Sequence, residues 1–280
     1  MTTAQGIRVS REWLALREPA DAAARARDLV EHLVRQLRPP SHWVIHDLGC
    51  GTGAMGRWLA PLLAGPQHWV LHDRDADLLD VAAAEAPGPA ADGAAATVEA
   101  RQSDVARLSE DDLAGATLIT ASALLDLLTE DELARLLAAC CGAGCPTLLT
   151  LSVVGRVELM PADPLDRRVA VAFDAHQRRM TERGHLLGPD AVAFAVKEIA
   201  RWGTVLVRPS AWRLGVTEAE LAAEWFTGWL DAAYEQQPEL GGEAGGYRRR
   251  RLQQACAGRL AATVHHADLL VLPRPNAALS

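Results

Sequence analysis

The sequence predicts an α/β fold in which helices cover a mostly parallel β-sheet. The strongest indication is the segment 43–53, where a strand-like run ends near Asp47 and leads into a glycine-rich turn, after which 54–64 has a helical pattern. Strand-like and helical segments then alternate as far as residue 153. Because neighbouring parallel strands need a crossover connection, repeated units of this kind favour a parallel sheet with helices on both faces.

The elements of the first half follow in order along the chain. An alanine-rich helical pattern over 20–38 ends before two prolines. Acids at 110–112 favour the start of a helix after Ser109. Residues 129–132 fit a capping box, which opens a helix that ends at Cys141. The strands are expected at 43–48, 68–72, 96–102, 116–120 and 147–153, and further helices at 54–64 and 75–85.

The second half is less regular. The charged segment 155–184 is predicted as an insertion, and a helix at 189–202 and a strand at 204–207 follow it. A second capping box, 217–220, opens a predicted helix to Tyr234. The loop 238–246 then leads to a basic helix at 247–260 and a final strand at 263–272.

Size and charge limit the function classes. The chain has 280 residues, enough for one large α/β domain with added elements. Its 36 acidic and 28 basic residues give a formal net charge of −8, which argues against a broad nucleic-acid-binding surface. No apolar run reaches the ~18 residues that span a bilayer, and no signal-peptide core is present. The expectation is a cytoplasmic protein without a membrane or nucleic-acid partner.

The five cysteines do not predict a metal site. Three of them cluster at 140–145, but no Cys or His pair at zinc-finger spacing accompanies them. Cys50 lies inside the glycine-rich turn. We interpret the cysteines as small apolar residues in a reducing compartment.

The glycine-rich turn carries the functional information. From Asp47 to Gly53 the residues read Asp-x-Gly-x-Gly-x-Gly between a strand and a helix N-terminus, where backbone can approach a nucleotide-like ligand closely. This order resembles motif I of the class I S-adenosylmethionine (SAM) dependent methyltransferases. The resemblance implies a Rossmann-like sheet that is mostly parallel with an antiparallel last strand, and SAM as cofactor.

A dinucleotide site is the competing interpretation. Residues 51–56 also fit the G-x-G-x-x-G pattern, and Asp73 lies 20 residues after Gly53, where a ribose-binding acid is expected. Two details favour SAM. The glycines begin at Gly49, directly after the strand, and Asp47 would repel a pyrophosphate but not a sulfonium or an ammonium. An NAD(P)-dependent oxidoreductase, a non-catalytic SAM-binding protein and an RNA methyltransferase remain alternatives.

The family resemblance assigns cofactor contacts along the chain. The acid that binds both ribose hydroxyls matches Asp73, and the adenine contacts match the side chain of Asp104 and the backbone of Val105. Arg74 stands where the family often has an apolar residue over adenine, a position from which its side chain can still stack on the base. The remaining implied contacts are backbone from Gly49, Cys50, Gly51 and Gly53, the strand-end residues Ala121 and Ser122, and an N-terminal arginine for the SAM carboxylate, with Arg25 chosen over Arg17 and Arg27.

The resemblance also implies the domain organisation. A single methyltransferase domain would span 1–280, with an N-terminal helical segment at 1–40 and a SAM-binding core at 41–154. The insertions 155–187 and 211–261 would then cover the substrate site, because ligands of such sheets bind outside the carboxyl ends of the strands.

The acceptor is predicted to be a small molecule, with oxygen favoured over nitrogen or carbon. Strand four is not followed by the Asn- or Asp-Pro-Pro-aromatic motif of several amino-group methyltransferases, and no Pro-Cys dipeptide indicates a cysteine nucleophile. A hydroxyl acceptor needs a base, for which His176 is the first choice and Asp126 the second. The tryptophans at 225 and 229 favour a core, and the run 248–251 fits either an anion site or a solvated helix face.

Overall fold

The computed structural model describes residues 9–36, 40–85 and 87–274, with backbone only for 242–244. Its main sheet has seven strands in the order β3-β2-β1-β4-β5-β9-β8. The first five strands are parallel, whereas β9 runs antiparallel between β5 and β8. This order confirms the predicted Rossmann-like sheet. The strands are β1 (Trp43–Leu48), β2 (Gln67–Asp73), β3 (Ala96–Gln102), β4 (Leu118–Ser122), β5 (Thr147–Met160), β8 (Gly203–Leu214) and β9 (Ala261–Pro273).

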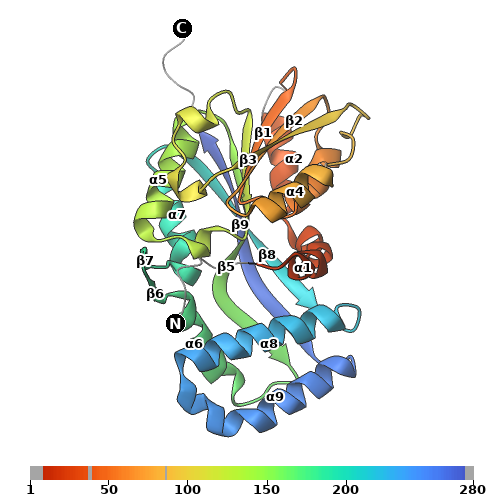
Figure 1. The fold of residues 1–280 in the computed structure, drawn as a ribbon, viewed down its shortest axis with the longest axis vertical. Helices are drawn as coiled ribbons and strands as arrows, with labels where there is room; N and C mark the ends of the chain where they lie inside the picture. Colours follow the sequence, from red (N-terminus) through yellow and green to blue (C-terminus); the bar gives the residue numbers. More distant parts are fainter. Residues whose placement is uncertain (1–8, 37–39, 86, 275–280) are drawn as a thin grey trace.

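Helices cover both faces of this sheet (Figure 1). Alternate residues of a strand point to opposite faces, so Leu118 packs into one hydrophobic core and Ile119 into the other. Leu148 and Leu149 divide in the same way. One face carries α2 (Arg27–Gln36), α3 (Ala54–Leu59) and α4 (Ala76–Ala84), and the other carries α5 (Glu130–Gly142) and α7 (Ala191–Ile199).

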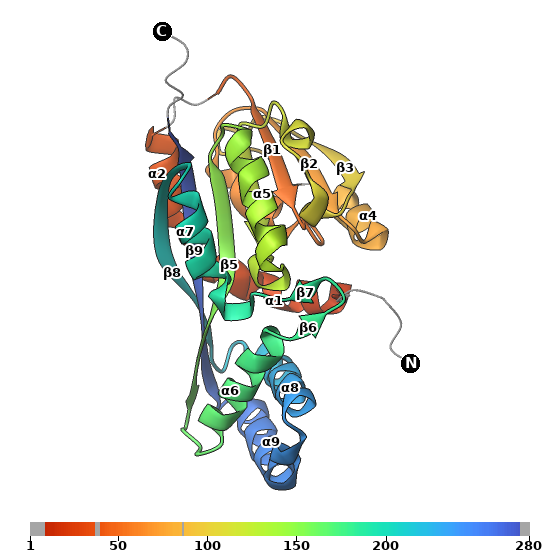
Figure 2. The same ribbon diagram turned by 90° about the vertical axis from the view of Figure 1, so that its left-hand side faces the viewer.

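The strands β5, β9 and β8 are long and extend beyond the other four strands of the sheet into a second packing unit. There β5, β8 and β9 meet α6 (Asp166–Gln177), α8 (Ala219–Gln236) and α9 (Gly241–Cys256), which we call the lower lobe (Figures 1 and 2). Trp225, Phe226 and Trp229 are buried in the hydrophobic core of this lobe, as the helical spacing predicts. The short hairpin of β6 (Met180–Thr181) and β7 (Gly184–His185) follows α6.

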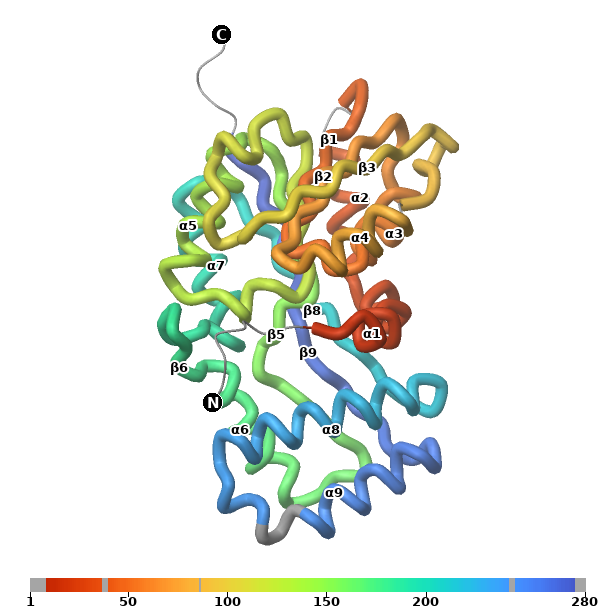
Figure 3. Tube along the Cα trace, in the orientation of Figure 1, coloured from red at the N-terminus to blue at the C-terminus, as the bar shows by residue number. Residues whose placement is uncertain are grey.

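The N-terminal segment differs from the prediction. Instead of one helix over 20–38 there are two, α1 (Arg11–Ala24) and α2, and residues 37–39 lie outside the described residues. The chain turns at Arg25, which has an extended ψ of 136°. Figure 3 shows α1, in red, lying between the sheet and the lower lobe. Because of the turn at Arg25, α1 and α2 run in different directions.

Several other expected elements change length or type. The capping box of Thr129 and Glu132 is confirmed, but the helix expected after Ser109 is only the 3-10 turn Asp111–Leu113. The second capping box is wrong, because Glu218 precedes α8 without a side-chain cap and instead accepts a hydrogen bond from Gly215 N. Residues 155–160 and 211–214, expected in the insertions, prolong β5 and β8, and α9 begins inside the expected loop 238–246.

Candidate functional site

A cleft of about 570 Å³ opens at the carboxyl ends of β1, β2 and β4. That is the edge at which parallel α/β sheets bind ligands, and the volume falls within the range of ~300–1,000 Å³ usual for small-molecule sites. The structure brings ten of the predicted cofactor residues to this cleft: Arg25, Asp47, Gly49, Cys50, Gly51, Asp73, Arg74, Asp104, Val105 and Ser122. Of the other predicted residues, Gly53 begins α3 and Ala121 is buried in β4; neither is among the described residues of the cleft wall.

The glycine turn after β1 is shaped for close approach. Gly49 and Gly51 have φ values of +68° and +55°, a region that favours glycine. A Cβ on Gly51 would lie 3.2 Å from Leu14 Cδ1 of α1. The amides of Gly49 and Cys50 both donate to the carbonyl oxygen of His72 in β2, at 2.8 and 3.0 Å. The turn is thus fixed between β2 and α1.

The acid at the end of β2 is held by the backbone around it. Asp73 is half-buried, and its Oδ2 accepts a hydrogen bond from Gly51 N at 2.9 Å while Oδ1 accepts one from Asp75 N at 3.0 Å. A carboxylate oxygen can accept two hydrogen bonds, so both oxygens keep capacity for a ligand. Asp73 is therefore oriented and still able to accept from two hydroxyl groups.

Asp104 combines a structural role with its place in the cleft. It is exposed, and its Oδ1 accepts a hydrogen bond from Ala106 N at 3.1 Å, which caps the 3-10 turn Val105–Arg107. Its Oδ2 lies 3.5 Å from Arg107 Nε. The cap fixes the carboxylate beside Val105 at the cleft wall.

Two buried side chains of opposite charge face the same end of the cleft with unused polar atoms. Arg25 is 4% exposed and donates from Nη2 to Ser122 Oγ at 3.2 Å, whereas its Nε and Nη1 have no partner. Asp47 is 1% exposed; Oδ1 accepts from Thr120 Oγ1 at 2.8 Å and Oδ2 has no partner. Burial raises the pKa of Asp47 to about 6. A ligand that carries a carboxylate and an ammonium would satisfy both groups.

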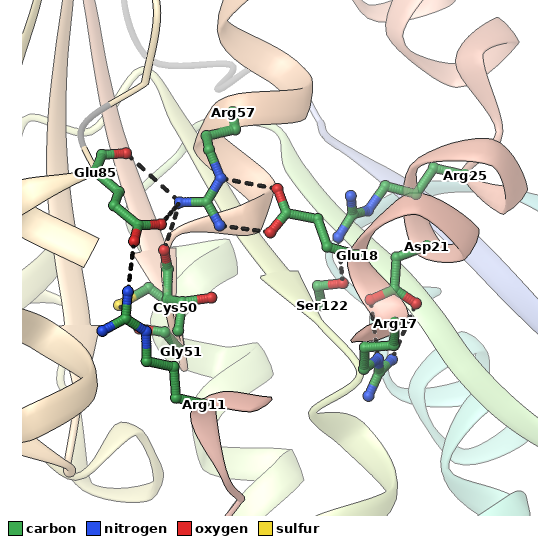
Figure 4. Close-up of polar contacts among 11 residues, drawn as sticks. Arg11, Arg17, Glu18, Asp21, Arg25, Cys50, Gly51, Arg57, Glu85 and Ser122 are labelled. Carbon is green, nitrogen blue, oxygen red and sulfur yellow. Dashed lines mark hydrogen bonds and ion pairs between the residues drawn. The ribbon is translucent and has the colours of Figure 1, made fainter. Parts of the chain in front are cut away.

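Helix α1 closes one side of the cleft through ion pairs, as Figure 4 shows. Arg57 of α3 binds both carboxylate oxygens of Glu18 at 2.8 and 2.6 Å and the carbonyl oxygen of Thr52 at 2.6 Å. Arg11 pairs with Glu85 at 3.0 Å. These contacts attach α1 to α3 and to the end of α4. The sequence offered no motif for them, because the pairs join residues that are 39 and 74 positions apart.

A second ion pair on α1, between Arg17 and Asp21, also lines the cleft. Arg17 binds Asp21 through both carboxylate oxygens, at 2.9 and 3.2 Å. Trp212 donates from Nε1 to Asp21 at 2.9 Å, and the Arg17 guanidinium lies 5.0 Å from the Trp212 ring centre. Both charged residues line the cleft, together with Leu14, Leu124, Leu127, Leu128 and Arg183.

Neither of the two predicted base candidates is among the described residues that line the cleft. His176 Nε2 on α6 lies 3.3 Å from Glu235 of α8, and burial of the imidazole, whose side chain is 14% exposed, lowers its pKa. Asp126 is half-buried in the 3-10 turn Leu125–Leu127, beside cleft-lining Leu124 and Leu127. Burial raises the pKa of Asp126, and attraction to Arg17 and Arg179 opposes that change.

The arginine run 248–251 belongs to the lower lobe, which does not support an anion site at the cleft. Arg251 is 1% exposed and binds Asp166 at 2.5 Å. Arg250 binds Asp163 at 2.8 Å, and Arg248 pairs with Asp231. The run therefore joins α9 to α6 and α8. Among the described residues of the two predicted insertions, 155–187 and 211–261, only Arg183 lines the cleft.

The described residues contain neither a membrane-spanning helix nor a metal-binding cluster. None of the helices there combines the length and the apolar character that a bilayer crossing requires. The His, Cys, Asp and Glu side chains of the same ranges form no group of three or more suited to a metal ion. All five cysteines are free, and burial raises the pKa of Cys141 to about 11 and that of Cys145 to about 12.

Comparisons with known proteins agree with this geometry. Residues 45–147 match the family model of a methyltransferase domain. A cyclopropane synthase from Mycobacterium tuberculosis has a similar structure, with a TM-score of 0.50, 13% identity and 94% of each chain covered. Magnesium protoporphyrin IX methyltransferase from Synechocystis, with S-adenosylhomocysteine (SAH) bound, has a TM-score of 0.44 and 15% identity over 74% of this chain and 83% of that one. A search of curated protein sequences gives no match.

The strand order, the glycine turn after β1 and the acid that ends β2 define an α/β protein that binds a nucleotide-like ligand. The match of residues 45–147 to a methyltransferase domain favours SAM over a dinucleotide. The domain match over residues 45–147 supports a SAM-dependent methyltransferase with SAM as its cofactor. The same match argues against an NAD(P)-dependent oxidoreductase, and methyl transfer from SAM would distinguish an enzyme from a non-catalytic SAM-binding protein.

Proposed function

We propose that the cleft residues hold SAM, with the ribose and adenine contacts that the family resemblance implies and with the ammonium on Asp47 rather than on the carbonyls of Gly49 and Ala121. The oriented carboxylate of Asp73 would accept hydrogen bonds from both ribose hydroxyls, and Asp104 and Val105 would contact adenine beneath Arg74. At the other end, the unpartnered atoms of Arg25 and Asp47 would bind the carboxylate and the ammonium of the amino-acid moiety. The observation that supports this arrangement is the pair of opposite buried charges, which an amino-acid zwitterion satisfies and a nicotinamide does not.

The pKa of Asp47 gives this arrangement a pH dependence. Because its pKa is about 6, Asp47 is mostly ionised at pH 7 and mostly protonated at pH 5. The ammonium needs the ionised form, so binding at low pH must displace a proton. We expect SAH affinity to be constant above pH 7 and to fall by about tenfold per pH unit below pH 6. Calorimetry between pH 5 and pH 8 measures this.

Two controls assign the pH dependence to Asp47. 5′-Methylthioadenosine shares the adenosyl part of SAH but lacks the amino-acid end, so its affinity should change little over the same range. Asp47→Asn should weaken SAH at pH 7 and remove most of its pH dependence. An equal loss of affinity for both ligands, or an unchanged profile in Asp47→Asn, would contradict the assignment.

We further propose that the methyl acceptor is a small molecule. SAM supplies an electrophilic methyl group on a neutral leaving thioether, so the protein contributes mainly alignment and exclusion of water. The cleft wall also contains Leu14, Leu124, Leu127 and Leu128, and Leu14 of α1 packs against the glycine turn. A cleft of about 570 Å³ suits a cofactor with a compact, partly apolar acceptor better than a polymer. The negative net charge of −8 supports the same choice, because it disfavours binding to the phosphates of a nucleic acid.

The proposed acceptor atom is oxygen, with Asp126 as the general base. A hydroxyl must lose its proton during transfer, and a carboxylate whose pKa is raised by burial is a stronger base than an ordinary one. Asp126 lies in the 3-10 turn between Leu124 and Leu127, which line the cleft, whereas His176 lies beside Glu235 between two helices of the lower lobe. Asp126 is therefore favoured over His176.

Transfer of tritiated methyl from SAM to a panel of small phenols, carboxylic acids and amines, with total RNA as a further acceptor, tests the function. We expect product from hydroxyl acceptors and a kcat for Asp126→Asn that is lower by about 10²-fold, with partial recovery on phenols of low pKa. His176→Asn serves as the matched control and should stay within about twofold. Preferred transfer to amines or RNA, or an unchanged kcat in Asp126→Asn, would contradict this proposal.

A further inference from the structure

Asp268 is a buried acid in β9 that lies behind the cleft wall. It is 0% exposed and accepts three hydrogen bonds from three different parts of the chain. Oδ2 accepts from Ala26 N at 2.8 Å, and Oδ1 accepts from Leu151 N at 2.7 Å and from Ser210 Oγ at 2.5 Å. A carboxylate in the interior is costly unless such donors surround it, so this arrangement is specific.

Two of these donors belong to segments that meet again at Arg25. Ala26 directly follows Arg25, and Arg25 donates to Ser122 Oγ at 3.2 Å. Leu151 directly follows Thr150, which donates from Oγ1 to the same Ser122 Oγ at 3.1 Å. The contacts therefore form a closed ring that runs from Asp268 through the α1–α2 turn, the end of β4 and the middle of β5 back to Asp268.

The β5 part of this ring has a backbone that its surroundings must hold in place. Leu151 has a φ of +57°, which is unfavourable for a residue with a side chain, and the pairing of β5 with β9 shifts register between Leu149 and Ser152. The hydrogen bond from Leu151 N to Asp268 satisfies the amide that this bulge turns away from the ladder. The same carboxylate holds the backbone next to Arg25 and attracts the guanidinium.

We propose that Asp268 is a positioning residue that fixes the Arg25 guanidinium for the carboxylate of SAM. The proposal rests on the role of Arg25 in the proposed function. A long arginine side chain loses rotational freedom when it binds a ligand, and the ring around Ser122 removes much of that freedom in advance. Asparagine cannot replace the acid fully, because its single oxygen cannot accept from both Ala26 N and Leu151 N at the two positions that the carboxylate oxygens occupy.

The test compares two ligands by calorimetry on the full chain. SAH carries the carboxylate that Arg25 binds, and 5′-methylthioadenosine does not. We expect Arg25→Ala to weaken SAH by about 10–100-fold and Asp268→Asn to weaken it by about 3–10-fold. Both variants should bind 5′-methylthioadenosine within about twofold of the original protein. The double variant should lose little more than Arg25→Ala alone, because Asp268 acts through Arg25.

The outcomes separate this proposal from the proposed function. If Arg25→Ala leaves SAH affinity unchanged, Arg25 does not bind the carboxylate and the cofactor arrangement is wrong. If Arg25→Ala weakens SAH while Asp268→Asn spares it, or weakens both ligands equally, the positioning role of Asp268 is overturned. Asp166→Asn breaks a buried pair of the lower lobe and controls for lost stability; it should lower the unfolding temperature without changing the ratio of the two affinities.

A milder variant covers the case in which Asp268→Asn does not fold. Ser210→Ala removes one donor to the same carboxylate and leaves both backbone donors in place. It should weaken SAH by about twofold to threefold and leave 5′-methylthioadenosine unchanged. No change in SAH affinity, or an equal loss for the two ligands, would overturn the proposal with this variant.

Discussion

Replacing Asp73 with alanine is expected to weaken SAM and SAH binding by about 1–3 kcal/mol. The side chain accepts hydrogen bonds from Gly51 N at 2.9 Å and Asp75 N at 3.0 Å, so it supports the glycine turn as well as the proposed ribose contact. Its loss removes a charged acceptor for two hydroxyl groups and leaves two amides to find water. Calorimetry with SAH measures the change, and thermal unfolding establishes that the variant is folded.

The ribose is common to SAH and 5′-methylthioadenosine, which makes the Asp73 result specific. Asp73→Ala should weaken both ligands by similar factors, in contrast to the selective loss expected for Arg25→Ala. Asp92→Ala is a suitable matched control, because Asp92 is exposed and holds only the turn around Gly65 and Ala94 by backbone hydrogen bonds. A folded Asp73→Ala variant with unchanged affinity for both ligands would remove Asp73 from the cofactor site.

The parts of the fold that could be predicted are those with a local pattern. The strand 96–102 has the predicted limits, and the capping box at Thr129 correctly marks the start of α5, because each depends on neighbouring residues. The cofactor side of the cleft was predictable for a similar reason. In a parallel sheet the ends of β1, β2 and β4 meet at one edge, so residues that follow those strands are brought together.

The missed parts depend on contacts between distant residues. An alanine-rich pattern continues smoothly through Arg25, yet the chain turns there, because Asp268 binds the amide of Ala26 from 242 positions away. The extensions of β5 and β8 beyond their predicted ends are stabilised by packing in the lower lobe, which a local sequence pattern does not reveal. The acids at 110–112 favour a helix start, but Asp112 instead accepts hydrogen bonds from Ser109, and only a 3-10 turn forms.

For the arginine run 248–251, a structural role and a substrate-binding role can be tested against each other. Arg251 is 1% exposed; Nη2 binds both oxygens of Asp166 at 2.5 and 2.6 Å, and Nη1 donates to Pro161 O at 2.6 Å. Arg250, its neighbour, pairs with Asp163 at 2.8 Å through a side chain that is 55% exposed. The two arginines thus offer a buried and an exposed ion pair between the same parts of the lower lobe.

Arg251→Ala is expected to lower the free energy of unfolding by about 3–5 kcal/mol, because it leaves the carboxylate of Asp166 and the carbonyl of Pro161 without their main partner. Arg250→Ala should cost less than about 1 kcal/mol, since water can replace an exposed pair. Urea unfolding followed by circular dichroism measures both, and both variants should keep SAH affinity because neither residue lines the cleft. A stable Arg251→Ala protein with a raised KM for the acceptor would instead identify the run as part of the substrate site.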